Sequence, residues 1–361
     1  MTAAVPAPDP RLAELGWRPY FSAQLSGEDA AQFVPVRVMA VHRGKIAVAG
    51  AGTEWLIPPH IAPAPGALAA NAEENHPAVG DWLLIAPDTQ QIGRILHRAS
   101  LFKRRAPGHG RKLQLIAANV DTLFIVASCN QDFSVARLER YLVLAREVGV
   151  TPIIVLTKVD LAAAPADFAA AAHGLQQGLV VETVNAKDPI SVARLTARCA
   201  KGETVALLGS SGVGKSTLIN TLRGSTNIAT QPVRKGDGKG RHTTTVREMH
   251  RLEHGGWLLD TPGMRELQLA DAAEGLAEVF DDFILAALSC RFSNCGHGGE
   301  PGCAVQAGLA DGTLDADRLG RWRKLTTEDA ANTAGQTGRR RSPRPIGSIA
   351  HSAAHEIDHD D

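Results

Sequence analysis

Residues 209–217 read Gly-Ser-Ser-Gly-Val-Gly-Lys-Ser-Thr, which matches the phosphate-binding pattern G-x-x-x-x-G-K-S. The backbone N–H groups of such a loop surround anionic oxygens, and the helix that follows adds positive potential at its N-terminus. An apolar run before the loop predicts a buried strand, and an apolar run after it predicts that helix. We therefore predict a nucleoside triphosphate site, with Lys215 on the β- and γ-phosphates and Ser216 on Mg²⁺. The residues predicted to contact the phosphates are Gly209, Ser210, Ser211, Gly212, Val213, Gly214, Lys215, Ser216 and Thr217.

A second stretch, Asp-Thr-Pro-Gly at residues 260–263, ends another apolar run and has the pattern D-x-x-G. Asp260 can hold Mg²⁺ directly or through water, and the N–H of Gly263 can meet the γ-phosphate. The residue after this pattern is Met264, whose thioether cannot orient an attacking water as the glutamine of many GTPases does. We therefore expect slow hydrolysis unless another group or a partner supplies this function.

A third stretch, Thr-Lys-Val-Asp at residues 157–160, is similar to the guanine-reading pattern N-K-x-D. Asp160 would accept hydrogen bonds from guanine N1–H and the exocyclic amine, which adenine cannot offer, and Lys158 would pack under the base. Thr157 replaces the usual asparagine, so a hydroxyl stands in for an amide. Asn185 and Ala186, at the end of the next apolar run, are predicted to form a second loop beside the base.

The order of these motifs is unusual, because the base-reading loop precedes the phosphate loop in the chain. A circular permutation explains the order: all the loops end parallel strands, so cutting the sheet elsewhere leaves the site intact. Between the phosphate loop and Asp260 lies a glycine-rich, charged stretch, residues 235–245, which we interpret as a switch loop. Thr243 or Thr244 in this stretch is a candidate to complete the Mg²⁺ shell.

Three cysteines and one histidine follow, with the spacing Cys290-x₄-Cys295-x-His297-x₅-Cys303. Three thiolates and an imidazole can bind one Zn²⁺ tetrahedrally. These four ligands fill the coordination sphere of the ion, so no position remains for a water molecule. We therefore predict a structural zinc site. Cys129 and Cys199 lie in apolar segments and are predicted to be small core residues.

The composition is consistent with an intracellular protein of several domains. The chain has 361 residues, with 38 basic and 38 acidic side chains, so net charge alone does not indicate a partner. We find no membrane-spanning run and no signal peptide pattern, and expect a cytoplasmic monomer. Basic residues cluster at 94–112, 234–247 and 339–341; each cluster is either a nucleic-acid contact or a solvated face.

The hydrophobic pattern divides the chain into five parts. Residues 1–33 are an N-terminal extension, and residues 34–110 contain short alternating strands typical of an oligonucleotide-binding (OB) β-barrel that binds RNA. In residues 111–270, strands alternate with helices as in a doubly wound α/β GTPase domain. Residues 271–329 are a helical zinc-binding domain, and residues 330–361 are a polar tail that we expect to be disordered.

With these residues in place, the chain from about residue 34 to 328 resembles the ribosome small subunit-dependent GTPase A family (RsgA/YjeQ). The resemblance rests on the permuted motif order, the stretch Gly-Arg-His-Thr-Thr-Thr at 240–245 and the cysteine spacing. It implies a factor for late maturation of the 30S ribosomal subunit, which binds 16S rRNA and converts GTP to GDP and phosphate under stimulation by the subunit. It also implies His242 as a catalytic residue beside Lys215.

Two other classes of protein remain open. The first is an ATP-dependent nucleic-acid enzyme with a phosphate loop, an OB module and a zinc module; Asp160 argues against it. The second is a structural RNA chaperone with a vestigial nucleotide site; Lys215, Ser216 and Asp260 argue against it.

Overall fold

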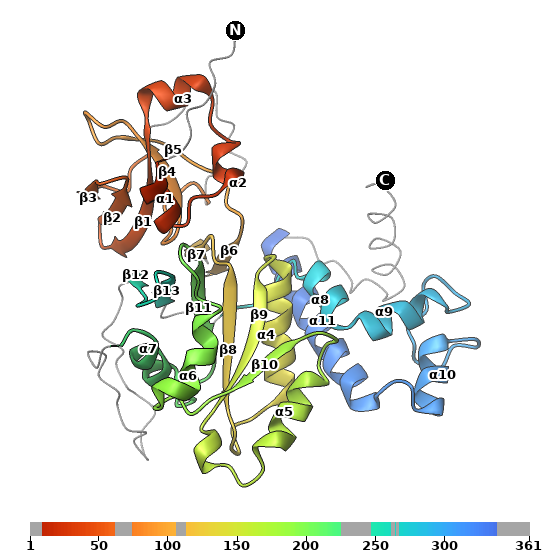
Figure 1. The fold of residues 1–361 in the computed structure, drawn as a ribbon. Helices are drawn as coiled ribbons and strands as arrows, with labels where there is room; N and C mark the ends of the chain where they lie inside the picture. Colours follow the sequence, from red (N-terminus) through yellow and green to blue (C-terminus); the bar gives the residue numbers. More distant parts are fainter. Residues whose placement is uncertain are drawn as a thin grey trace. The chain divides into compact units, whose positions relative to one another are not determined.

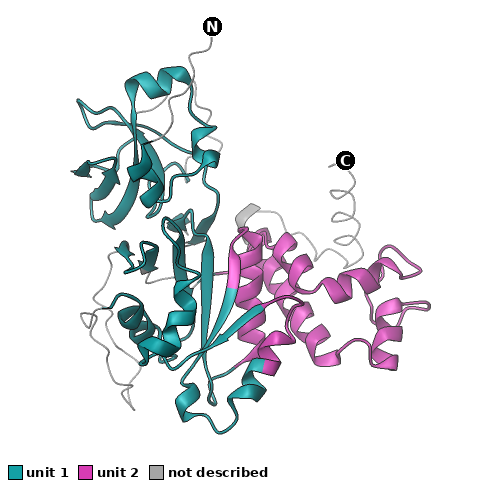
Figure 2. Cartoon of the chain, in the orientation of Figure 1, with its two compact units in different colours: residues 1–133, 153–169, 180–267 teal, residues 134–152, 170–179, 268–361 magenta. Residues whose placement is uncertain are grey.

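The computed structural model describes residues 9–61, 74–105, 113–224, 247–260, 264 and 267–337. The chain divides into two compact units (Figure 2). The first unit contains residues 1–133, 153–169 and 180–267, and the second contains residues 134–152, 170–179 and 268–361. The parts predicted as barrel and GTPase domain thus fall largely in one unit.

The centre of the first unit is a sheet whose strands run in the order β10-β9-β8-β11-β13-β12 (Figure 1). β11 is parallel to both β8 and β13, β10 is parallel to β9, and β12 is antiparallel to β13. The strand order reverses between β8 and β11, which is where ligands bind in doubly wound sheets. The strands are β8 (Thr122–Ser128), β9 (Thr151–Thr157), β10 (Val180–Thr183), β11 (Thr204–Leu208), β12 (Arg247–Arg251) and β13 (Trp257–Asp260).

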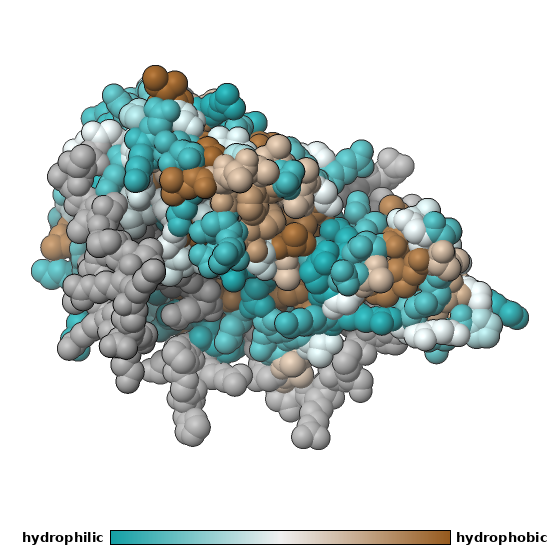
Figure 3. All heavy atoms as spheres, turned by 90° about the horizontal axis from the view of Figure 1, so that it is seen from below, coloured by the Kyte–Doolittle hydropathy of each residue, from teal (hydrophilic) through white to brown (hydrophobic). Residues whose placement is uncertain are grey.

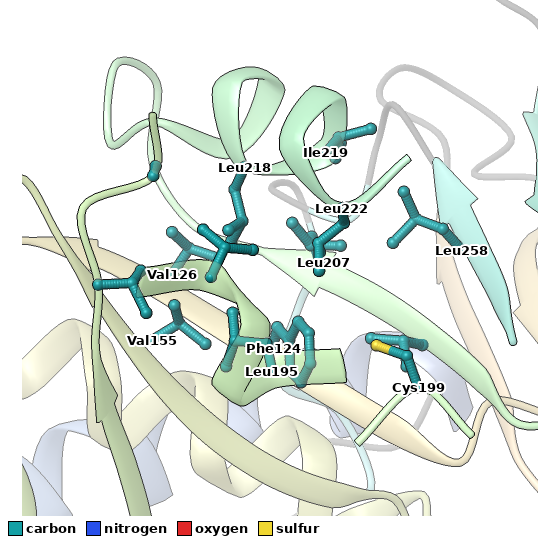
Figure 4. Packing of buried hydrophobic residues seen from close by; sticks show 14 of the residues in the cluster. Phe124, Val126, Val155, Leu195, Cys199, Leu207, Leu218, Ile219, Leu222 and Leu258 are labelled. Atoms are coloured by element: carbon teal, nitrogen blue, oxygen red, sulfur yellow. The ribbon is translucent and has the colours of Figure 1, made fainter. Parts of the chain in front are cut away.

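These strands form because their sequences are apolar on both faces. Every residue of β8 and of β11 is buried, as expected for parallel strands covered by helices. On one face, α6 (Pro189–Thr196) and α7 (Lys215–Leu222) contribute Leu195 and Leu218 to a core with Phe124 and Leu207 (Figure 4). This core fixes the helix that follows the predicted phosphate loop.

Five antiparallel strands precede this sheet, in the order β3-β2-β1-β4-β5, and an isolated bridge from Ile61 to Ile92 brings the two ends of that order together. Alternate side chains fill an apolar core that includes Val36, Val38 and Ile46. The strands are β1 (Val34–His42), β2 (Lys45–Gly50), β3 (Glu54–Ile57), β4 (Trp82–Ile85) and β5 (Ile92–Ile95).

The N-terminal segment packs against the outer side of these strands. It contains α1 (Pro10–Glu14), α2 (Pro19–Ser22) and α3 (Gly27–Gln32). Trp17 and Phe21 pack on Trp82, with ring centroids 4.8 Å and 5.8 Å away. The residues predicted as an extension therefore carry part of the core of the unit.

Two features join the N-terminal strands to the central sheet. Strand β1 pairs with β12, through Ala40 opposite Glu248 and Val41 opposite Arg247, so the two sheets are continuous. A hairpin of β6 (Leu101–Arg105) and β7 (Leu113–Ala118) leads into β8. The predicted boundary at residue 110 lies between these two paired strands, so the structure does not divide there.

The second unit is helical. It contains α4 (Val135–Glu147), α8 (Ala273–Val279), α9 (Asp281–Leu288), α10 (Ala304–Asp311) and α11 (Ala316–Thr337), and α5 (Pro165–His173) crosses from the first unit into it. Glu139 of α4 is fully buried and binds Arg318 and Arg321 of α11. Because a buried charge requires partners, this pair of arginines holds α4 against α11.

Within the part predicted to be helical, residues 273–288 form two helices, α8 and α9, on either side of Phe280. One sequence expectation for this unit differs from the structure. Helix α11 extends to Thr337, past the point at residue 330 where the tail was predicted to begin. The remainder of that predicted tail lies outside the described residues.

None of the described helices is both long and apolar enough to cross a membrane. On the face of the molecule seen in Figure 3, apolar residues form separate patches among hydrophilic ones.

Candidate nucleotide and metal sites

The predicted phosphate loop connects β11 to α7 in the geometry that its glycines permit. A Cβ on Gly209 would lie 2.3 Å from the carbonyl oxygen of Val126, and Gly214 has φ 98°, a left-handed conformation. Gly214 is also the N-cap of α7. The ammonium of Lys215 donates to the carbonyl oxygens of Gly209, at 2.7 Å, and Ser210. The lysine is thereby held over the loop where phosphates would lie.

The predicted base-reading loop follows β9. Lys158 adopts a left-handed conformation with φ 59°, and a short 3-10 helix, η2 (Val159–Leu161), begins directly after it. Asp160 is exposed, so its carboxylate is accessible to a base. Thr157 is fully buried, and its hydroxyl lies 2.5 Å from the carbonyl oxygen of Val213. The first and last residues of this motif therefore have different surroundings.

The second predicted base loop, at Asn185 and Ala186, follows β10. The backbone N–H of Asn185 is bound by the hydroxyl of Ser191, and its side-chain oxygen accepts from the N–H of Lys187 at 3.0 Å. The hydroxyl of Thr221 on α7 donates to the carbonyl oxygen of Ala186 at 2.7 Å. This contact of Thr221 was not predicted, because a threonine inside a helix gives no sequence signal of a distant partner.

The strand order brings these loops to one edge of the sheet. β9, β10 and β11 carry the predicted loops at their carboxyl ends, and Asp260 is the last residue of β13. Only the backbone of Asp260 is described. Met264 is 1% exposed, which leaves its side chain in the core. Gly263, His242, Thr243 and Thr244 lie outside the described residues, so their predicted roles stay predictions.

The predicted zinc ligands converge on one point in the second unit. The Sγ atoms of Cys290, Cys295 and Cys303 and the imidazole of His297 all lie within 4.8 Å of one another. Cys290 Sγ is 3.8 Å from Cys303 Sγ, and His297 Nδ1 is 3.5 Å and 3.3 Å from these two atoms. A tetrahedral zinc ion with bonds of about 2.3 Å to sulfur and about 2.0 Å to nitrogen requires edges of about 3.8 Å and 3.5 Å. The four side chains therefore fit this ion.

The surroundings of the cluster favour metal binding by these groups. Burial lowers the pKa of His297, which favours the neutral imidazole that binds metals. Burial, together with the neighbouring thiols, raises the pKa of Cys295 to about 11. A cation bound among the sulfur atoms would lower this pKa and favour the thiolate. The carbonyl oxygen of His297 accepts from Gln306 and Arg323, at 2.5 Å and 2.8 Å. The loop is thus anchored to α10 and α11.

Glu300 shapes the loop between the ligands. Its carboxylate accepts from the backbone N–H groups of Gly296, Gly298 and Gly299, at 2.8, 2.7 and 3.1 Å. These hydrogen bonds lower the pKa of Glu300 to about 2, so it is ionised at neutral pH.

The basic cluster predicted around residues 94–112 is largely engaged within the protein. Arg94 pairs with Asp29, Arg98 with the fully buried Asp81, and Lys103 with Glu74. Arg98 is mostly buried as well. Arg94 and Arg98 therefore take part in ion pairs within the fold rather than present a free basic face.

The sequence is similar to a known protein family over most of its length. The sequence model described as RsgA GTPase matches residues 95–270. "Small ribosomal subunit biogenesis GTPase RsgA" from Mesorhizobium japonicum is 47% identical over 96% of this chain and 98% of that protein. "Small ribosomal subunit biogenesis GTPase RsgA 2" from Vibrio vulnificus is 44% identical over 94% of this chain and 93% of its own length.

Two solved structures share the fold. "YloQ, a circularly permuted GTPase" is 26% identical and has a TM-score of 0.58 over 83% of this chain and 96% of its own. YjeQ from Thermotoga maritima is 23% identical, with a TM-score of 0.60 over 81% of this chain and 97% of its own.

The strand order and the loops at its carboxyl edge define a circularly permuted GTPase fold. At 47% identity over almost the whole chain, the protein belongs to the RsgA GTPase family. The predicted family and the predicted class of enzyme, a GTP hydrolase, are thereby confirmed. An ATP-dependent nucleic-acid enzyme, the alternative that the sequence left open, is not favoured.

Proposed function

We propose that this protein hydrolyses GTP to GDP and phosphate in late maturation of the 30S ribosomal subunit, and that the subunit stimulates hydrolysis. The proposal rests on one observation: the carboxyl ends of β9, β10, β11 and β13, which carry the predicted motifs, lie along the same side of the sheet. Motifs scattered over a hundred residues of chain then act as one site. Relatives at 44–47% identity carry the name small ribosomal subunit biogenesis GTPase, which supports the choice of subunit.

In the proposed complex, the guanine base lies between the loop after β9 and the loop after β10. Asp160 accepts from the Watson–Crick edge of guanine, while Lys158, Asn185 and Ala186 border the ring. The backbone N–H groups of residues 209–217 bind the phosphates, and Lys215 stabilises negative charge as the bond to the γ-phosphate breaks.

Mg²⁺ would supply further charge stabilisation when bound with GTP. Its proposed ligands are Ser216, Asp260 and either Thr243 or Thr244, and Gly263 would contact the γ-phosphate. Since Met264 is buried and apolar, the group that positions the water must be another, and we propose His242 for it. The zinc ion would organise the loop at residues 290–303 and take no part in hydrolysis.

We further propose that the five-stranded N-terminal part is an OB barrel that contacts 16S rRNA in the cytoplasm. OB barrels hold RNA through exposed basic side chains on their strands and loops. The turn between β1 and β2 exposes His42, Arg43 and Lys45. By contrast, the engaged Arg94 and Arg98 have little charge to offer to RNA.

The proposal is tested by measuring GTP turnover alone and with purified 30S, 50S and 70S particles. We expect stimulation by particles that contain 30S subunits, and loss of turnover in Lys215→Ala. The Lys324→Ala variant is a matched control, because Lys324 is an exposed lysine of α11, outside all the loops proposed to bind the nucleotide. Equal turnover with 30S and 50S, or stimulation that survives in Lys215→Ala, would reject the proposed function.

A further inference from the structure

We infer that Thr157 is a positioning residue that ties the base-reading loop to the phosphate loop, and that it does not read the base itself. This inference rests on the proposed guanine-nucleotide site. Thr157 has 0% of its surface exposed. Its hydroxyl oxygen lies 2.5 Å from the carbonyl oxygen of Val213 and 3.2 Å from that of Ala127.

The hydroxyl has one proton, so it donates fully to only one of these carbonyl groups. The shorter contact assigns the proton to Val213, fifty-six positions along the chain. No donor remains for N7 or O6 of a guanine base, where an asparagine amide would have N–H groups to offer. Recognition of the base therefore falls to Asp160, which is exposed at the end of the same motif.

Fixing the carbonyl of Val213 also fixes the N–H of the residue after it. In a trans peptide the C=O and N–H groups point in opposite directions. When the carbonyl of Val213 points toward Thr157, the N–H of Gly214 therefore points away from it. Gly214 is the N-cap of α7 and precedes Lys215. The contact thus holds one phosphate-binding N–H group in place before the nucleotide arrives.

The base-reading loop and the phosphate loop approach each other closely at Thr157 and Gly214. A Cβ on Gly214 would lie 3.5 Å from the hydroxyl oxygen of Thr157, which is van der Waals contact. A second contact works in the same way on the other base loop, where Thr221 of α7 donates to Ala186 at 2.7 Å. Both base loops are therefore tied by a threonine hydroxyl to the element that holds the phosphates.

The experiment compares Thr157→Val, which keeps the shape and removes the hydroxyl, with Thr157→Ser, which keeps the hydroxyl. Thr183→Val is the control, because Thr183 neighbours this region on β10 and its side chain makes no hydrogen bond within the described residues. Affinities are measured for GTP, for GDP and for 7-deaza-GTP, in which a C–H group replaces N7.

We expect Thr157→Val to weaken GTP, GDP and 7-deaza-GTP by the same factor of about ten, the effect of one lost buried hydrogen bond. Thr157→Ser should restore binding to within about threefold, and Thr183→Val should bind as the wild type does. The wild type should bind GTP and 7-deaza-GTP equally well, because position 157 offers N7 no donor.

Three results would overturn the inference. Unchanged affinities in Thr157→Val would show that the hydroxyl does not hold the phosphate loop. A wild type that prefers GTP to 7-deaza-GTP, with the preference lost in Thr157→Val, would show that Thr157 reads the base. Failure of the wild type to bind either GTP or GDP would overturn the proposed function together with the inference.

Discussion

The guanidinium of Arg37 on β1 donates a hydrogen bond of 2.8 Å to the hydroxyl of Thr204, the first residue of the strand that leads to the phosphate loop. Arg37 also donates to the carbonyl oxygens of Leu15, Gly80 and Asn119, at 2.5, 3.3 and 3.2 Å. It is fully buried, and burial lowers its pKa to about 10, so it stays charged at neutral pH. One side chain thus joins the N-terminal strands to the base of the central sheet.

Replacing Arg37 by methionine should destabilise the first unit by about 3 kcal/mol or more, because it leaves several buried acceptors without donors. Lysine at this position should recover only part of that loss, since its three donors lack the planar geometry of a guanidinium. Urea unfolding followed by tryptophan fluorescence would measure both changes. The control Arg43→Met, on an exposed turn, should change stability by less than about 0.5 kcal/mol. A similar small change for Arg37→Met would contradict the role assigned here.

Replacing Asp160 by asparagine should change which base is preferred. The carboxylate accepts from N1–H and the amine of guanine, whereas an amide can pair with the carbonyl at position 2 of xanthine. We expect GTP affinity to fall by at least about a hundredfold and XTP affinity to rise, in competition measurements with labelled nucleotide. Asp188→Asn is the matched control, because Asp188 caps α6. Retained GTP selectivity in Asp160→Asn would exclude this carboxylate from base recognition.

The zinc prediction can be tested by metal analysis of the purified protein. The wild type should carry about one zinc ion per chain, since four ligands complete a structural site. Cys295→Ser and Cys303→Ser should lose most of it, while Cys199→Ser should keep it. Cys199 is buried far from the cluster in sequence, and burial raises its pKa to about 12, so its thiol is not a ready ligand. Zinc retained in both cluster variants would contradict the assignment.

Glu300 should control how tightly the zinc loop closes. Its carboxylate orders three N–H groups on both sides of His297, and a neutral amide offers a single, weaker acceptor for them. Glu300→Gln should therefore release zinc to a chelator about tenfold faster than the wild type at neutral pH. Asp311→Asn is a suitable control, since Asp311 caps a turn after α10. Equal release rates in Glu300→Gln and the wild type would show that the loop closes without this carboxylate.

The sequence predicted the central sheet well, for a physical reason. Strands such as β11 are buried on both faces, so they appear as uninterrupted apolar runs, and the glycines of the phosphate loop mark where such a run ends. Local features can be predicted for the same reason: Ser134 caps α4 by accepting from the N–H of Arg137, a close neighbour in the chain.

Features that depend on distant partners could not be predicted. The β6–β7 hairpin includes Lys103, Arg104 and Arg105, whose charges indicated a surface cluster rather than a strand. The break between α8 and α9 falls at Phe280, which fits the helical pattern but is buried with Arg318 4.9 Å from its ring centre. Likewise, no local pattern shows that Thr157 meets Val213.

We predict that the stability of the second unit depends on pH through Glu147, at the end of α4. Its carboxylate accepts from the N–H of Gly275 at 2.9 Å, but burial and the nearby Glu274 and Asp329 raise its pKa from 4.5 to about 7. Between these two pKa values the folded state binds more protons than the unfolded state. This contribution to stability is complete below about pH 4.5 and is lost as the pH rises through 7.

The variant Glu147→Gln removes this titration while keeping an oxygen that can accept from Gly275. Compared with the wild type, it should be more stable by about 1–2 kcal/mol at pH 8, after allowance for partial exposure, and nearly equal at pH 5. Thermal unfolding of both proteins from pH 5 to 8 would measure the difference in their stabilities. The other titratable groups are the same in both proteins, so their effects cancel in this difference. Glu54→Gln, on an exposed position of β3, should parallel the wild type throughout. If the gain from Glu147→Gln were the same at pH 5 and pH 8, its cause would be packing, and the carboxylate would not titrate in this range.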